Sequence, residues 1–177
     1  GYLYLTITTA EQDVAAWARV LEIVYAIMGV LTGGCMISLA KAQGVQMTEK
    51  SAAMTLVPLF WSCLHLLVNY RMTCTDPRLP LFAFGLLADV MLVLAFYQIA
   101  RLLYGRPQPM LLALFGALAA VMSFSDLGGY GLARLMGVTS VAWPGKMLLR
   151  SGLSAAACIY VLAQLFVLCS RNADHAE

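Results

Sequence analysis

Residues 79–100, LPLFAFGLLADVMLVLAFYQIA, decide the fold because they form an apolar run long enough to cross a lipid bilayer. A transmembrane helix needs about 20 consecutive, predominantly apolar residues. Only Asp89 interrupts the run, and it stands between two halves that are free of charge. The stretch therefore predicts one membrane-spanning helix with a single carboxyl group in its interior.

Four further charge-poor windows lie on either side of this stretch. With their helix ends added, the five predicted spans cover residues 14–40, 51–70, 79–104, 107–125 and 147–170. The whole chain, residues 1–177, is then a single integral membrane domain: an all-α, polytopic transmembrane helical bundle of about five spans. The connection 126–146 is the one long loop, and its many glycines predict an interfacial or re-entrant segment there rather than a sixth span.

The composition supports a lipid environment. Apolar residues make up 62% of the 177 residues, against 11 basic and 9 acidic residues, and the mean hydropathy is +0.82. A soluble surface needs roughly a quarter to a third of its positions charged, which this chain cannot supply. The net charge of +2 comes from scattered residues, so no basic field for nucleic acid is expected. The lipid bilayer is the first predicted partner.

The positive charges leave the orientation open. With five spans, six basic residues fall on one side of the membrane and five on the other, so the positive-inside rule selects neither orientation. On the first span, Arg19 and Glu22 are three residues apart and predict an interfacial ion pair.

Asp89 and His65 are the predicted intramembrane polar residues. Asp89 lies about ten residues into its span, hence roughly 15 Å deep, where an ionised carboxylate costs several kcal/mol unless it is paired or hydrated. It must face protein or water, and His65 on the second span is a candidate partner. Three interpretations are open: an ion or proton pathway, a hydrogen-bonded aspartate that joins helices or subunits, or a shallower position than the count suggests.

Small residues at helical spacing predict close helix packing. Glycine lets two backbones approach each other within a membrane. The candidate packing positions are Gly29 and Gly33 on the first span, Gly85 on the third, Gly116 on the fourth and Gly152 on the last.

No catalytic, metal or cofactor motif is present. The chain has only two histidines, His65 in a span and His175 in the tail, which does not suit a haem or metal ligand set. Its five cysteines include no C-x-x-C pair and are interpreted as packing residues. The chain is therefore predicted to be no enzyme, with no cofactor and no metal.

The order of features in residues 20–137 resembles a group of small polytopic inner-membrane proteins. The shared features are a Gly33-Gly34 span followed by Lys41, Gly44, Gln46 and Met47; then Ala95-Phe96 with Arg101-Leu102-Leu103; and finally a Gln108-Pro109 loop, Gly116 and a break at Gly128-Gly129. The group belongs to bacterial type IVB (Dot/Icm-like) secretion and IncI-type conjugation systems. The resemblance implies a non-enzymatic membrane subunit of such an apparatus and carries over no functional residue.

The sequence thus predicts a non-enzymatic, multi-pass subunit of a larger complex in the bacterial inner membrane, most plausibly a conjugation or type IV secretion apparatus. Its protein partners would be other membrane subunits or further copies of the chain. The alternative is a small transporter or channel, such as a phage holin-like pore, with Asp89 on the path.

Overall fold

The computed structural model describes residues 16–42, 53–73, 79–104, 108–137 and 145–174. In these ranges the chain forms five helices: α2 (Ala16–Ala42), α4 (Leu56–Thr73), α5 (Leu79–Leu103), α6 (Pro109–Leu135) and α7 (Gly145–Asp174). Pro80 and Pro109 stand in the first turns of α5 and α6, where the missing N–H has no intrahelical partner to lose. The all-α prediction is confirmed for the described residues.

Four of these helices are long and apolar enough to cross a membrane, so the chain is a multi-pass membrane protein. The candidate spans are Val20–Ala40, Ala83–Leu102, Pro109–Ala133 and Leu148–Val167. Helix α4 lies where the second of the five spans, residues 51–70, was expected, but it is not among the four. It has 18 residues and carries His65, Asn69 and Arg71 in its second half, which lowers its hydropathy. A fifth span at α4 therefore stays a prediction.

Helix α6 corrects the expected long loop. The span was predicted to end at residue 125, followed by a glycine-rich interfacial or re-entrant segment, but the helix continues to Leu135. Two residues after the helix ends, Gly137 has a φ of +70°, the left-handed conformation that is common just past helix C-termini. A glycine inside a helix costs only about 1 kcal/mol, and in lipid a helix keeps its backbone hydrogen bonds. Asp126 therefore lies on a helix and not in a loop.

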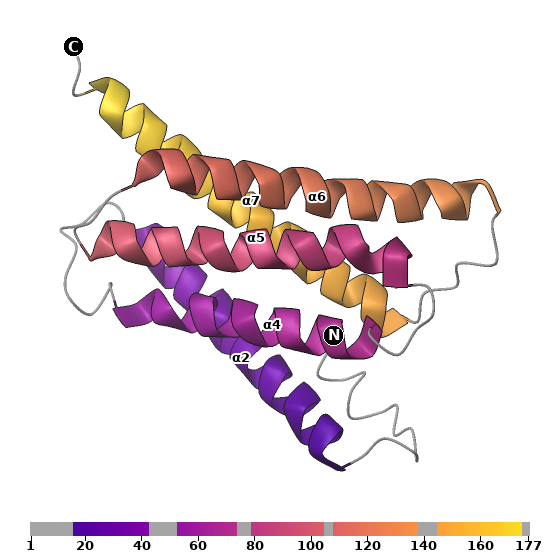
Figure 1. Ribbon diagram of the computed structural model, residues 1–177. Helices are drawn as coiled ribbons and strands as arrows, with labels where there is room; N and C mark the ends of the chain where they lie inside the picture. The colour runs from indigo at the N-terminus through magenta and orange to yellow at the C-terminus, as the bar shows by residue number, and fades with distance from the viewer. Residues whose placement is uncertain (1–15, 43–52, 74–78, 105–107, 138–144, 175–177) are drawn as a thin grey trace.

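The helices form two layers. In Figure 1, α4, α5 and α6 run side by side, while α2 and α7 cross behind them at an angle. Helix α5 is the centre of the bundle because it packs against α4, α6 and α7, whereas α2 packs mainly on α4. Accordingly, 44% of the α5 span is buried against 22% of the α2 span.

Helices α2 and α4 run antiparallel, as two contact pairs show. Tyr25 on α2 contacts His65 on α4. One turn further along α2, Gly29 contacts Trp61, which lies one turn before His65 on α4. The close approach at Gly29 is real, since a Cβ there would lie 3.2 Å from the Trp61 indole nitrogen. Helices α6 and α7 are also antiparallel, because Asp126 late in α6 contacts Ser151 early in α7, whereas Gly116 early in α6 lies against Val161 further along α7.

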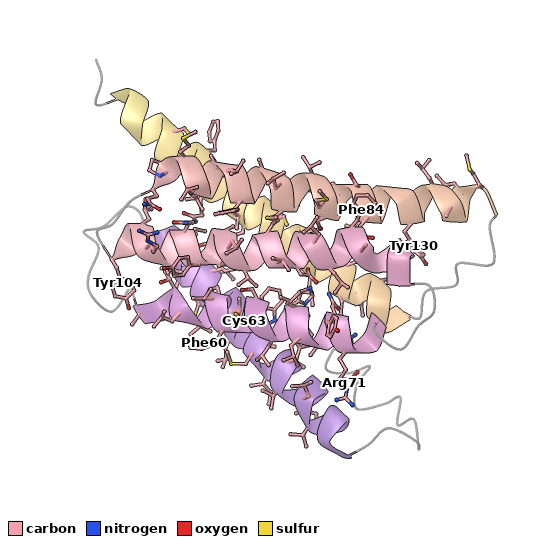
Figure 2. All side chains as sticks on the ribbon, viewed as in Figure 1. Phe60, Cys63, Arg71, Phe84, Tyr104 and Tyr130 are labelled. Atoms are coloured by element: carbon pink, nitrogen blue, oxygen red, sulfur yellow. The ribbon has the colours of Figure 1, made fainter. Side chains whose placement is uncertain are left out.

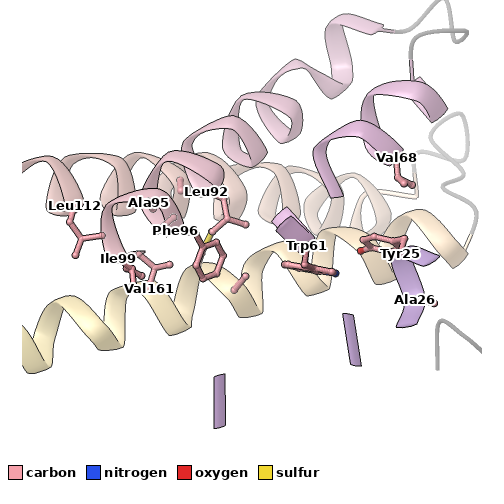
Figure 3. Close-up of a cluster of buried hydrophobic side chains, with 14 residues drawn as sticks. Tyr25, Ala26, Trp61, Val68, Leu92, Ala95, Phe96, Ile99, Leu112 and Val161 are labelled. Atoms are coloured by element: carbon pink, nitrogen blue, oxygen red, sulfur yellow. The ribbon is translucent and has the colours of Figure 1, made fainter. Parts of the chain in front are cut away.

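The apolar core occupies the middle of the bundle (Figure 3). Leu92 and Phe96 of α5 are buried against Leu112 of α6 and Val161 of α7. Helices α6 and α7 approach closely at Gly116, where a Cβ would lie 3.0 Å from both Val161 and Leu165. Because Gly116 has no side chain, the side chains of α7 pack directly against the backbone of α6 at this position.

Large apolar side chains project outward from the bundle (Figure 2), among them Phe60 of α4 and Phe84 of α5. An open groove of about 710 Å³ runs between these two helices and is lined by apolar atoms of Leu67, Leu87 and Val90. In a membrane such surfaces face lipid or a partner, because no water competes for them.

Candidate functional site

Asp89 lies at the centre of a buried hydrogen-bond network. Only 2% of the residue is exposed, and two other helices, α4 and α7, supply its partners. Asn69 of α4 donates to one carboxylate oxygen at 2.6 Å, and Ser154 of α7 donates to the other at 3.0 Å. His65 Nε2 lies 3.3 Å from that second oxygen. The carboxylate is therefore held by protein and not by lipid or bulk water.

His65 is fully buried and connects Asp89 to α2. Its Nδ1 lies 2.7 Å from the Tyr25 hydroxyl, and its Nε2 lies 3.2 Å from the Asn69 amide nitrogen as well as near Asp89. The imidazole also stacks on two aromatic rings, with centroid distances of 5.1 Å to Trp61 and 5.6 Å to Tyr25. Helix α4 can place His65 and Asn69 together because residues four apart share one helical face.

This arrangement satisfies His65 in each of its protonation states. If Nε2 is bare, it accepts from Asn69 while Nδ1–H donates to the Tyr25 oxygen. If Nε2 carries the proton, it donates to Asp89 while Nδ1 accepts from the Tyr25 hydroxyl. The imidazolium donates to both Tyr25 and Asp89, since a tyrosine hydroxyl can donate or accept.

A second carboxyl group, Asp126, lies next to this network. The Ser151 hydroxyl donates to it at 3.2 Å, and Ser151 is three residues before Ser154 on the same face of α7. Gly85 of α5 makes room for it, because a Cβ at this position would lie 3.2 Å from an Asp126 oxygen. Sequence reasoning missed Asp126 because it ended the span at the first charge; accepting one interior charge, as for residues 79–100, could have found it.

Glu22 and Arg150 join α2 to α7. The guanidinium donates to the Glu22 carboxylate at 3.1 Å, and Arg150 is only 2% exposed. The sequence predicted an interfacial Arg19–Glu22 pair, which stays a prediction, and the structure adds a partner for Glu22 far along the chain. The Arg19 side chain lies outside the described residues. Spacing along one helix could not have revealed a partner on another.

All these groups lie in one half of the bundle, which we call the polar cluster. Its members are Glu22, Tyr25, His65, Asn69, Asp89, Asp126, Arg150, Ser151 and Ser154. They stand early in α2, α5 and α7 and late in α4 and α6, which is one side of an antiparallel bundle. Five helices thus contribute to a single polar region.

An apolar layer on α5, α6 and α7 borders the polar cluster toward the other side. It is built from Leu92, Ala95 and Phe96 of α5, Ala119 of α6 and Val161 of α7, all buried. Among the described residues, the buried polar side chains away from the cluster include Thr32, Thr55, Ser62 and Gln98, none of them charged. The cluster therefore reaches part of the way through the bundle.

The predicted packing glycines fall into two groups. Gly29, Gly85 and Gly116 lie at close helix contacts, against Trp61, Asp126 and the Val161–Leu165 pair. Gly33 and Gly152 do not: within the described ranges, a Cβ at either position would meet nothing within 4 Å. At these two positions close packing within the described bundle is not seen, and packing against another helix stays a prediction.

Hydrogen bonding and proton exchange are the chemistry that this geometry allows. In the parts of the chain that the structure describes, no group of three His, Cys, Asp or Glu side chains could hold a metal ion. Cys158 is buried beside the network, and Cys35, Cys63 and Cys169 are also free thiols.

A comparison of the chain with known protein families, with curated proteins and with solved structures found no match.

Proposed function

We propose that the chain is a non-enzymatic subunit of a larger bacterial inner-membrane complex, and that this complex is a conjugation or type IV secretion apparatus. The outer face of α2 carries this proposal. The apparatus is suggested by the resemblance of residues 20–137 to small membrane subunits of such systems. The same face would serve a subunit of any other membrane complex.

The outer face of α2 has the form of a helix-docking surface. Its exposed apolar side chains recur at helical spacing and are mostly β-branched: Val20, Ile23, Val24, Ile27, Val30, Leu31 and Ile37. Gly33 and Gly34 interrupt this stripe with open space above them. Small residues within an apolar stripe let another transmembrane helix approach closely. Helix α2 is also the least buried of the four spans.

The polar cluster supports a structural role for the same chain. The carboxylate of Asp89 accepts from side chains of two other helices, and Arg150 binds Glu22 across the bundle. In a membrane, interhelical hydrogen bonds of this kind are worth roughly 0.6 to 2 kcal/mol each. A subunit built in this way can keep its own fold while its outer surface binds neighbours.

Site-specific photo-crosslinking in native membranes tests the proposal. A photoreactive amino acid at Val30, 71% exposed on α2, should give adducts with other membrane proteins, identified by mass spectrometry. The matched control is Phe166, 77% exposed near the end of α7, which should give mainly lipid adducts. Lipid adducts alone at both positions would contradict the proposal. Adducts of twice the chain mass alone would replace it with a homo-oligomer.

The second candidate is a small transporter or channel, favoured by the carboxylate of Asp89 at the centre of the bundle. The distribution of charge argues against it, because the buried charged side chains that the structure describes lie in one half of the bundle and only neutral polar side chains lie beyond them. Proton flux into liposomes should therefore be the same for wild type and Asp89→Asn, and no higher than in protein-free liposomes. A flux that wild type supports and the variant loses would establish the transporter instead.

A further inference from the structure

We propose that the His65–Asp89 pair is a reversible proton-binding site that exchanges protons with one side of the membrane only, the side on which α2, α5 and α7 begin. The ligand is the proton itself, and the site is a dead end, not a pathway. This inference does not depend on the partners of the chain.

The charges of the polar cluster favour a dissociable proton. Glu22 from α2 is matched by Arg150 from α7. Of the two other carboxyl groups, Asp89 lies against the His65 imidazole and Asp126 lies at the Ser151 hydroxyl. The other titratable groups nearby are the Tyr25 hydroxyl and the Cys158 thiol, which are neutral in their ordinary forms, and Arg71, half-buried on the last turn of α4. Two carboxylates without protons would be costly in a buried site, so these groups share protons among them.

The geometry lets the pair gain a proton without moving a heavy atom. Before protonation His65 is neutral and Asp89 is ionised: Nε2–H donates to the Asp89 carboxylate and the Tyr25 hydroxyl donates to Nδ1. When a proton reaches the Tyr25 oxygen, the original hydroxyl proton passes to Nδ1. The resulting Nδ1–H then donates back to the Tyr25 oxygen, and the imidazolium lies against the Asp89 carboxylate. The pair changes from a net charge of −1 to zero, and the hydroxyl is restored.

Protons have access to His65 from one side of the membrane because the polar cluster lies on that side of the bundle. On α7, Arg150, Ser151 and Ser154 lie in the first turns of the helix, and on α2 Glu22 stands one turn before Tyr25. Toward the other side, Leu92, Phe96 and Val161 carry no polar atoms, and the buried polar side chains described there, such as Ser62 and Gln98, are neutral. Protons are therefore expected to reach His65 from the near side, where the charged groups lie.

Trp61 is a built-in reporter for the protonation of His65. The two rings stack at 5.1 Å, and a charged imidazolium on an indole face interacts with its π electrons and quenches its fluorescence. The chain has only three tryptophans, so Trp17→Phe with Trp143→Phe leaves Trp61 as the sole emitter. This reporter leaves the network itself unchanged.

The experiment is an external pH jump, from about pH 8 to about pH 5, on this variant in sealed liposomes; the jump spans the ordinary titration range of histidine. The fluorescence of Trp61 should fall at once in every molecule whose near side faces outward. The remaining loss should appear only after nigericin equalises the internal pH. His65→Gln should abolish both phases, and His175→Gln should change neither.

The orientation of the molecules gives the expected size of the first phase. Cys169 is exposed near the end of α7, roughly 28 Å from Arg150 along the helix, and so marks the far side. In a variant that keeps Cys169 as its only cysteine, a membrane-impermeant maleimide labels molecules with the far side outward. The first phase should equal the unlabelled fraction. A complete immediate loss at mixed orientation would show two-sided access, and no loss after nigericin would show a sealed network; either result overturns the proposal.

Discussion

Replacing Asp89 with alanine should lower the free energy of unfolding by about 2–4 kcal/mol. The carboxylate accepts from Asn69 and Ser154 and lies against His65. Its removal takes one acceptor from the half-buried Asn69 amide and one from the buried Ser154 hydroxyl, and an unsatisfied buried group costs about 1–3 kcal/mol. Removal of one buried charge offsets part of that cost. Equilibrium unfolding by SDS in mixed micelles measures the difference.

The matched variant is Asp89→Asn, which keeps the shape and one acceptor oxygen. It should cost only about 1 kcal/mol, because a neutral hydrogen bond replaces a charge-assisted one. Leu114→Ala, on the exposed face of α6, should change stability by less than about 0.5 kcal/mol. An Asp89→Ala protein as stable as the Leu114→Ala control would show that the network contributes nothing to the fold.

Replacing Glu22 with alanine should cost about 3 kcal/mol by the same measurement. Arg150 is 2% exposed, and its guanidinium lies 3.1 Å from the Glu22 carboxylate. Removing one partner of a buried ion pair leaves the other charge in a poor environment, which typically costs about 3–5 kcal/mol. The expected value is at the low end because Glu22 retains some exposure.

The double variant Glu22→Leu/Arg150→Met distinguishes the cost of one unpaired buried charge from the contribution of the ion pair itself. Both charges are then replaced by apolar side chains of similar length, and such replacements are often neutral. Its stability should lie within about 1 kcal/mol of wild type, well above that of Glu22→Ala. A double variant less stable than Glu22→Ala would mean that Arg150 has a structural role independent of Glu22.

The charge at residue 89 made the centre of the site predictable. An ionised group deep in an apolar run must have a partner, and the sequence offered His65 as a histidine within another span. In the structure these two side chains meet at 3.3 Å. The physical rule concerns the cost of charge in lipid, so it applies before any helix packing is known.

The rest of the site depended on helix register, which local patterns do not contain. Tyr25, Asn69 and Ser154 are ordinary residues for a transmembrane helix, and only the rotation of each helix turns them inward. Asp126 was hidden by the rule that a span ends at a charge. Helix rotation also separates Gly29 from Gly33 on α2. Gly29 faces Trp61, whereas Gly33 has no neighbour within 4 Å.

The position of Ser154 and Arg150 on α7 bears on how the chain is synthesised. Of the five described helices, α7 leaves the ribosome last, yet it supplies one donor to Asp89 and the cation that meets Glu22. Until α7 has inserted, both carboxylates stand in the bilayer with incomplete surroundings. Water, protons or an insertion factor would have to stabilise these carboxylates until α7 packs against the other helices.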